Sequence, residues 1–225
     1  MNELKVLDSI QYSTKVHASY ALGSFFVDFL ATALSFLVFK FYETEVFLDL
    51  PLLTAVIIIY GIWNMFNDPF AGYILNRNIK YMKRFGKRFT WFLITGIPCS
   101  IIFFLIFIPP IINEFTIFFW LLFTLCLLDT LFSFLIISYQ SIYPDKFRSQ
   151  KERTKVGGIQ ILYSLFGLTL GTLIPTFIIT TNAPGTNINS YITVGLIVTI
   201  ICISIFLLMI HGMRENSQRL AEHFR

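Results

Sequence analysis

The amino-acid sequence predicts an all-α integral membrane protein whose membrane part is a bundle of six transmembrane helices. Of its 225 residues 56% are hydrophobic and 13% are charged, which is about half the charged content of an average soluble domain. Six apolar stretches are each long enough to cross a bilayer, which takes about 20 helical residues. Their interiors are rich in Phe and Ile and lack the two-residue alternation of a barrel strand. We place them at residues 20–39, 51–74, 90–109, 115–142, 156–180 and 191–211.

The first apolar stretch, residues 20–39, is predicted to remain in the protein as a helix. It is too long for a signal peptide, begins near residue 20 and lacks a small-residue cleavage site. The residues before it, 1–19, form a polar N-terminal segment. The residues after the last stretch, 212–225, are polar and of mixed charge, as in a cytoplasmic tail or the start of a linker. The predicted organisation is therefore a six-helix bundle over residues 20–211 between two cytoplasmic segments.

The charges of the connecting loops predict the orientation of the helices. The loops after the second and fourth stretches are strongly basic, whereas the other three carry acids or no charge. Cytoplasmic loops are enriched in Lys and Arg, so these two loops and both termini are predicted to face the cytoplasm of a cell. The basic residues are Arg77, Lys80, Lys83, Arg84, Lys87 and Arg88 after the second stretch and Lys146, Arg148, Lys151, Arg153 and Lys155 after the fourth.

The remaining composition excludes several classes of protein. The net charge of +4 comes from these loops and not from a solvated face, so no nucleic-acid partner is indicated. All three cysteines, Cys99, Cys126 and Cys202, lie in apolar stretches, which argues against both a disulfide framework and a zinc site.

Gly167 and Gly171 form a G-x-x-x-G pattern in the fifth stretch, which predicts close packing of that helix against a neighbour.

Three acidic residues interrupt the apolar stretches. Asp28 lies about eight residues into the first stretch, roughly 12 Å deep, and Asp129 lies near the middle of the fourth. Asp68 shares a face of the second helix with Asn64, four residues earlier. A carboxylate at the bilayer centre costs about 2.5–3.5 kcal/mol on insertion scales and usually marks a functional site. Acids that share a cavity would bind a cation, protons or a hydroxyl-rich solute; alternatively, each is satisfied separately by neighbouring polar groups.

The second stretch and the loop after it contain two recognisable elements. Residues 67–72 read N-D-P-F-A-G and residues 84–91 read R-F-G-K-R-F-T-W. They resemble the second helix and following loop of the glycoside–pentoside–hexuronide:cation symporters, the melibiose-permease-like branch of the major facilitator superfamily. Residues 20–28 resemble the first helix of that family, and Leu128-Asp129 with Ser141-Ile142-Tyr143-Pro144-Asp145 resembles its fourth helix and exit. The resemblance covers essentially the whole chain.

The resemblance implies the N-terminal half of such a transporter, with six helices in a 3+3 inverted repeat. In this family a second six-helix half completes the cavity at the middle of the membrane. Asp28 and Asp129 would face each other and accept hydrogen bonds from sugar hydroxyls, and Asp68 would form a cation site with Asp129. The basic loop would hold the cytoplasmic helix ends together when the inner side is shut. The residues assigned to this gate are Arg84, Lys87 and Arg88.

The chain departs from the family pattern at four positions. Asn64 replaces an acid of the cation site, and Cys126 stands where a hydroxyl is expected. Ser133 replaces an aromatic that packs on the sugar, and no arginine for the substrate occurs near Gln160. Asn carries no charge and a thiol is a poor ligand for a hard cation, so a proton fits this ligand set better than Na⁺. The predicted substrate residues are Asp28, Asp129, Ser133 and Gln160, and the predicted cation residues are Asp68, Asn64, Asp129 and Cys126.

The sequence therefore predicts half of a secondary active transporter that moves a small polar, sugar-like solute with a cation or proton by alternating access. A lysophospholipid is an alternative solute, because relatives in this branch handle such lipids. A non-transporting fragment or partner subunit is an alternative role. An enzyme is not indicated, because G-x-S-x-G, H-E-x-x-H and intramembrane aspartyl protease motifs are absent. The expected partners are membrane lipid and a C-terminal six-helix half or a second copy; no cofactor is expected beyond Na⁺ or H⁺.

Overall fold

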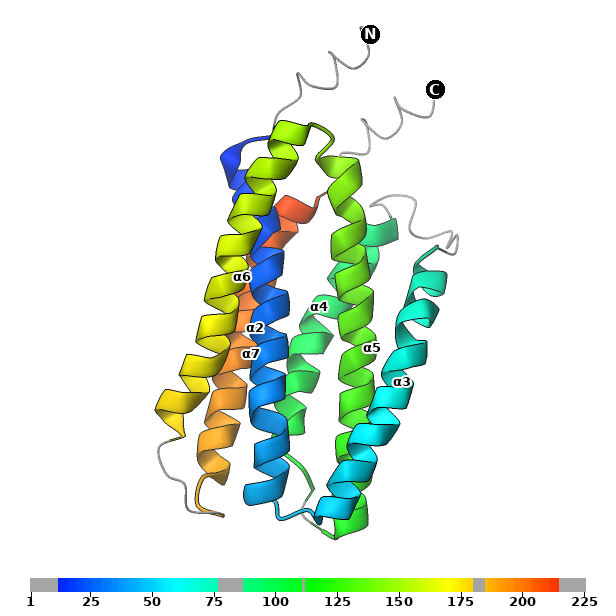
Figure 1. Ribbon diagram of the computed structural model, residues 1–225, viewed down its shortest axis with the longest axis vertical. Helices are drawn as coiled ribbons and strands as arrows, with labels where there is room; N and C mark the ends of the chain where they lie inside the picture. Colours follow the sequence, from blue (N-terminus) through cyan, green and yellow to red (C-terminus); the bar gives the residue numbers. More distant parts are fainter. Residues whose placement is uncertain (1–11, 77–86, 111, 180–184, 215–225) are drawn as a thin grey trace, which may run out of the picture.

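The protein is a bundle of six long α-helices in a computed structural model (Figure 1). The structure describes residues 12–76, 87–110, 112–179 and 185–214, and no strand occurs among them. All six helices are long and apolar enough to cross a membrane, which confirms the predicted all-α membrane fold. Their bounds are α2 Thr14–Thr44, α3 Leu50–Asn76, α4 Lys87–Ile106, α5 Glu114–Lys146, α6 Gln150–Ile178 and α7 Ile188–Met213.

Most of the helices extend beyond the apolar stretches predicted from the sequence. The first stretch was predicted at residues 20–39, but α2 covers Thr14–Thr44. Its added turns contain polar residues such as His17 and Lys40. A helix satisfies its own backbone hydrogen bonds whatever its side chains are, so it continues into the headgroup region. Hydropathy therefore finds the part of the helix inside the hydrocarbon layer and not its full length.

The contacts between helices follow a three-helix repeat. α2 packs mainly on α6 and α7, α5 packs mainly on α3 and α4, and α4 contacts α7. If α2, α3 and α4 are exchanged for α5, α6 and α7, the same set of pairs results. The pair α2–α6 becomes α5–α3, and the pair α2–α7 becomes α5–α4. Consecutive helices run in opposite directions (Figure 1), so the second set of three is inverted relative to the first. This arrangement is the predicted 3+3 inverted repeat.

The described ends of the chain, at α2 and α7, lie at one end of the bundle (Figure 1), which we call the termini end. There the Ser19 hydroxyl donates to Leu208 O (2.6 Å) and accepts from Gly212 N (2.7 Å), which joins α2 to α7. At the opposite end the buried Glu45 carboxylate accepts a hydrogen bond from Asn187 N (2.8 Å). Both ends of the α2–α7 pair are therefore held by hydrogen bonds between helix termini.

α6 lies very close to α2 at the two glycines of the G-x-x-x-G pattern. A Cβ on Gly167 would lie 2.8 Å from the carbonyl oxygen of Phe25 and 3.1 Å from the amide nitrogen of Phe29. A Cβ on Gly171 would lie 3.1 Å from the carbonyl oxygen of Phe29. The absence of side chains at these positions lets the two backbones meet. The predicted packing role of this pattern is confirmed.

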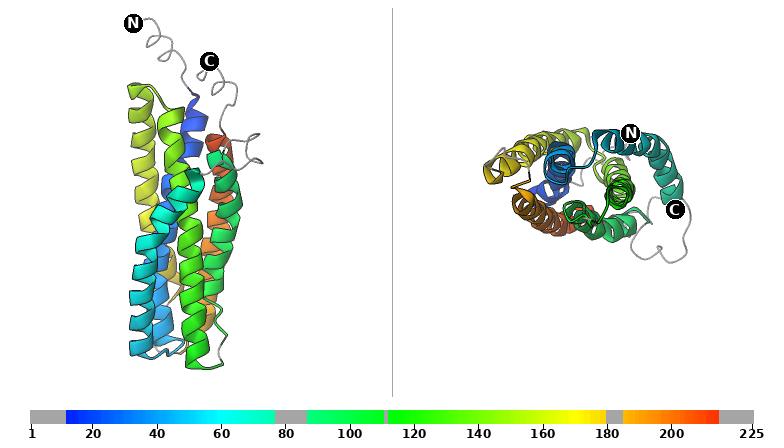
Figure 2. Two further views of the ribbon diagram at one scale, coloured as in Figure 1. Left: turned by 90° about the vertical axis from the view of Figure 1, so that its right-hand side faces the viewer. Right: turned by 90° about the horizontal axis from the view of Figure 1, so that it is seen from below.

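α3 and α6 lie on opposite sides of the bundle (Figures 1 and 2). In each, only 17% of the most apolar segment is buried, compared with 39–50% in the other four helices. Large apolar side chains cover the exposed faces of both. Examples are Ile58, Ile62 and Phe66 on α3 and Ile161, Leu165 and Phe177 on α6. These two helices therefore present apolar faces to lipid or to a partner.

Candidate functional site

A set of polar side chains joins α3 to α5 inside the bundle. Asp129 on α5 is only 7% exposed, and its carboxylate accepts three hydrogen bonds from α3. Asn64 Nδ2 donates to its Oδ1 (2.8 Å), Asn67 Nδ2 donates to its Oδ2 (2.9 Å), and the Tyr60 hydroxyl donates to Oδ1 (3.3 Å). The three donors follow an i, i+4, i+7 spacing, so one face of α3 carries them all. A carboxylate inside the bundle is thus paired entirely with neutral donors.

Ser133 connects this carboxylate to a second one. Its hydroxyl accepts a hydrogen bond from Asn67 Nδ2 (3.0 Å) and donates one to Asp68 Oδ1 (2.6 Å). Asp129, Asn67, Ser133 and Asp68 therefore form one continuous hydrogen-bonded chain between the two acids. Asp129 is buried, whereas Asp68 is exposed. We call the residues Tyr60, Asn64, Asn67, Asp68, Asp129 and Ser133 the α3–α5 polar cluster.

One buried oxygen of the α3–α5 polar cluster has no hydrogen-bond donor among the described residues. Asn67 is 2% exposed, and its Oδ1 is unpartnered while its Nδ2 serves both Asp129 and Ser133. A buried acceptor left unpaired costs about 1–3 kcal/mol. Carboxylate and amide oxygens are the ligands that hard cations prefer. The cluster thus offers oxygens for a small cation, and its hydrogen-bonded chain also offers a path between two acids for a proton.

Cys126 lies three residues before Asp129, on the same face of α5. Its sulfur adds a soft ligand beside an otherwise oxygen-rich set, which does not suit a hard cation. No group of three or more His, Cys, Asp and Glu side chains that could hold a metal ion occurs in the described ranges. The neighbourhood of Asp129 is therefore unlike a transition-metal site.

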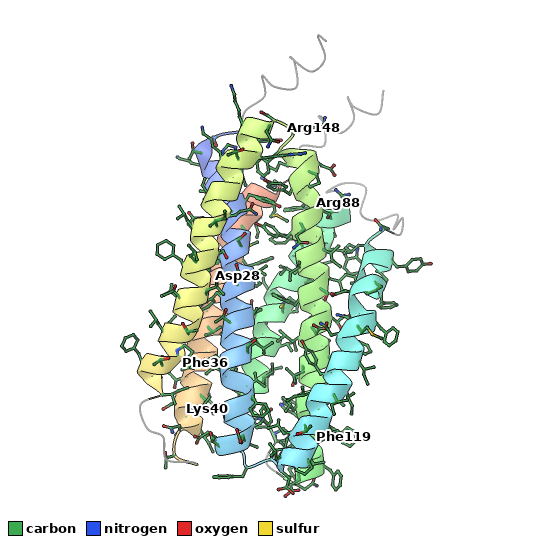
Figure 3. All side chains as sticks on the ribbon, in the orientation of Figure 1. Asp28, Phe36, Lys40, Arg88, Phe119 and Arg148 are labelled. Carbon is green, nitrogen blue, oxygen red and sulfur yellow. The ribbon has the colours of Figure 1, made fainter. Side chains whose placement is uncertain are left out.

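Asp28 lies in a different place, on α2 beside α6 (Figure 3). It lines a groove of about 400 Å³ between these two helices. Its carboxylate is partly exposed and has no hydrogen bond or ion pair with the described residues. The groove combines this charge and several hydroxyls with apolar side chains, so it suits a molecule with both polar and apolar parts. Lining residues include Asp28, Thr32, Ser35, Phe36, Leu168 and Thr172.

Gln160 belongs to a third group, where α2, α5 and α6 meet. Its Nε2 donates to the hydroxyl of Tyr139 (2.6 Å), which also lies 3.4 Å from the Ser24 hydroxyl. The Tyr20 hydroxyl donates to the carbonyl oxygen of Tyr139 (2.8 Å), and the two rings stack. Gln160 thus contributes to the packing of three helices.

The structure therefore separates residues that the sequence analysis grouped together. Asp28 was predicted to face Asp129, but its groove is formed by α2 and α6, whereas the partners of Asp129 come from α3. Ser133 lies one turn after Asp129 on α5, and its hydroxyl bonds Asp68 and Asn67; its predicted role in substrate binding stays a prediction. Of the predicted cation residues, Asn64, Asp68 and Asp129 do come together.

Tyr60 and Asn67 were absent from the predicted site. The signal for them was present in the sequence, since residues 60, 64 and 67 share one face of a helix at i, i+4 and i+7. Asn67 also directly precedes the acid of the N-D-P-x-x-G element. A search for polar residues on the face of Asn64 would have found both.

The structure describes one of the three side chains of the predicted cytoplasmic gate, that of Arg88. Arg84 and the side chain of Lys87 lie outside the described residues. The Arg88 guanidinium pairs with the Asp145 carboxylate and donates to the carbonyl oxygen of Ser141 (2.6 Å). This link joins the start of α4 to the end of α5 at the termini end of the bundle (Figure 3). Both side chains are substantially exposed, at 40% and 56%, so the pair contributes about 1 kcal/mol or less to stability.

Comparison with known proteins relates the chain to a family and to a curated relative. A family model described as MFS/sugar transport protein matches residues 19–224. The sodium-dependent lysophosphatidylcholine symporter 1-A of Danio rerio is 29% identical over 156 residues. The aligned part covers 69% of this chain but 29% of that protein. The chain therefore spans less than a third of the length of this relative.

Proposed function

The chain belongs to the MFS/sugar transport protein family, and we propose that it serves as one half of a secondary active symporter. Members of this family are transporters, which agrees with the absence of a catalytic motif in the sequence. The proposal rests above all on the α3–α5 polar cluster. Two acids on membrane-spanning helices, the buried Asp129 and the exposed Asp68, are joined through Asn67 and Ser133 and form a site that can be loaded with a cation.

The coupling ion in this proposal is Na⁺, held by oxygens of Asp68, Asp129 and Asn67. The unpartnered Asn67 Oδ1 supplies an oxygen that a cation would satisfy. The ligand set by itself favours a proton, but the zebrafish relative is named as sodium-dependent, which supports Na⁺ for this proposal. A bound Na⁺ would offset one of the two carboxylate charges and hold α3 against α5, because both helices contribute oxygens. This would lower the cost of the two acids within the membrane.

The solute in this proposal occupies the groove of Asp28 between α2 and α6. A sugar-like solute would use the carboxylate and the hydroxyls of Thr32 and Ser35 as hydrogen-bond partners. A lysophospholipid is the second candidate, because Phe36 and Leu168 give the groove an apolar side and the zebrafish relative is named for such a lipid. Both solutes would reach the groove along the exposed face of α6.

The proposal includes a location and a partner. The chain would lie in the cell membrane with both termini in the cytoplasm, as the basic loops predict. A C-terminal six-helix half or a second copy would cover part of the apolar faces of α3 and α6, and lipid would cover the rest. Alternating access then consists of rocking this bundle against its partner.

Na⁺ is expected to stabilise the purified chain against thermal unfolding, because a ligand that binds only the folded state adds to its stability. At a concentration a hundredfold above Kd the gain is about 2.7 kcal/mol, or roughly 5–10 °C in Tm for a chain of this size. The measurement is thermal unfolding in mild detergent with NaCl, and the control is KCl at equal ionic strength. Equal melting temperatures in the two salts would contradict sodium binding.

Asp28→Asn is expected to remove solute binding while leaving the response to Na⁺ intact, because Asp28 shares no contact with the α3–α5 polar cluster. Radiolabelled melibiose and lysophosphatidylcholine, each added to the reconstituted chain with Na⁺, would show which class binds. Lys40→Gln removes a charge from the same helix outside the groove and should leave binding unchanged. Unaltered binding by Asp28→Asn would contradict the proposed solute site.

A further inference from the structure

Two adjacent glycines in α6, Gly157 and Gly158, lack the packing reason that explains Gly167 and Gly171. A Cβ on either would meet nothing within 4 Å among the described residues. Each glycine within a helix costs about 1 kcal/mol relative to alanine. Bare helix surface therefore faces open space here, where another molecule can approach the backbone of α6.

Gly158 lies in a surface groove of about 740 Å³ that follows one face of α6. Lys151 and Lys155 line the part of the groove nearest the termini end, together with Thr154. Leu162 lines the part farther into the bundle, and the exposed Ile161 and Leu165 lie beside it. The groove thus has a cationic end and an apolar end.

The positive charge of this groove is not compensated within the described chain. The two described acids nearest the groove have partners: Asp145 is paired with Arg88, and the buried Glu152 lies 3.3 Å from His17. The two groove lysines are exposed and form no ion pair or hydrogen bond with the described residues. An anionic group from another molecule would therefore complete the site.

The length of α6 places the cationic end of the groove near the lipid headgroups and its apolar end beside the acyl chains. Its 29 residues span about 43 Å at 1.5 Å per residue, whereas the hydrocarbon core is about 30 Å thick. Roughly four or five residues at each end then lie at headgroup level. Lys151 and Lys155 lie at or next to that level, and Gly158 and Leu162 lie beside the acyl chains.

We propose that this groove binds an anionic phospholipid. Its phosphate would lie between Lys151 and Lys155, and one acyl chain would run over Gly158 and along Leu162. A lipid is favoured over an acidic partner helix because its phosphate lies at the depth of the two lysines and its acyl chain lies at the depth of Gly158 and Leu162. The proposal concerns a site apart from the groove of Asp28 and does not depend on the transport function.

The test is lipid retention by the whole chain. The chain is reconstituted into nanodiscs of equal parts phosphatidylcholine and phosphatidylglycerol, released in mild detergent and examined by native mass spectrometry. We expect the native chain to retain phosphatidylglycerol preferentially. In K151Q/K155Q this preference should fall on the order of fivefold for each lysine removed. The control K15Q/K40Q removes the same charge at exposed sites outside the groove and should keep the preference.

Gly158→Leu tests the same site without changing charge. Its side chain would fill the groove, and because the space is open and leucine favours a helix over glycine, the variant should fold with a Tm no lower than that of the native chain. We expect it to lose the preference for phosphatidylglycerol. Equal retention of both lipids by the native chain, or undiminished preference in both variants, would overturn the proposal. Loss of a dimer in Gly158→Leu without any change in lipid retention would show a helix–helix interface instead and would also overturn it.

Discussion

Asp129→Asn is expected to abolish the stabilisation of the chain by Na⁺ and to lower its own stability by about 2–3 kcal/mol. Three donors from α3 converge on this carboxylate, and hydrogen bonds to a charged acceptor are worth more than neutral ones. An amide at position 129 would lose the charge and set an NH₂ group against the donors of α3. Thermal unfolding in NaCl and in KCl measures both effects.

Asp145→Asn is the matched control for this variant. Asp145 lies on the same helix, and its side chain is 56% exposed with Arg88 as partner. Its loss should cost about 1 kcal/mol or less and leave the Na⁺ response unchanged. If Asp129→Asn kept the full Na⁺ response, the α3–α5 polar cluster would not be the cation site.

Gly167→Leu is expected to prevent stable assembly of α6 on α2, with a loss of at least about 3 kcal/mol. Its Cβ alone would lie 2.8 Å from the carbonyl oxygen of Phe25, and backbone cannot move aside as a flexible side chain can. Overpacking of a filled interface is itself costly, and membrane helices rely on close contact for association. Size-exclusion chromatography in mild detergent, followed by thermal unfolding, measures the yield and stability of the folded chain.

Gly72→Leu provides the comparison for Gly167→Leu. A Cβ on Gly72 would meet nothing within 4 Å among the described residues, so a leucine on this face of α3 should be tolerated. Similar losses for the two variants would mean that leucine harms any helix of this chain. Normal yield and Tm for Gly167→Leu would mean that α2 and α6 do not meet at this glycine.

Properties that depend on one helix at a time were predicted well from the sequence. The six spans follow from the length of apolar stretches, because the bilayer requires about 20 residues of each. The spacing of Gly167 and Gly171 predicted close packing, since small residues four apart lie on one face of a helix. The acids at positions 28, 68 and 129 were found because charge is costly inside a membrane. The cytoplasmic orientation remains a prediction.

The partners of these residues were decided only by the tertiary structure. Helical periodicity places Asp129 on a face of α5, but it does not say which helix covers that face. In the structure α3 covers it and brings Asn67, while Asp28 lies in a groove against α6. All six helices are apolar around most of their circumference, so no single stripe marks the buried side. Hydropathy alone therefore identifies the helices and their costly residues, and the packing of α3 on α5 and of α6 on α2 sorts those residues into separate sites.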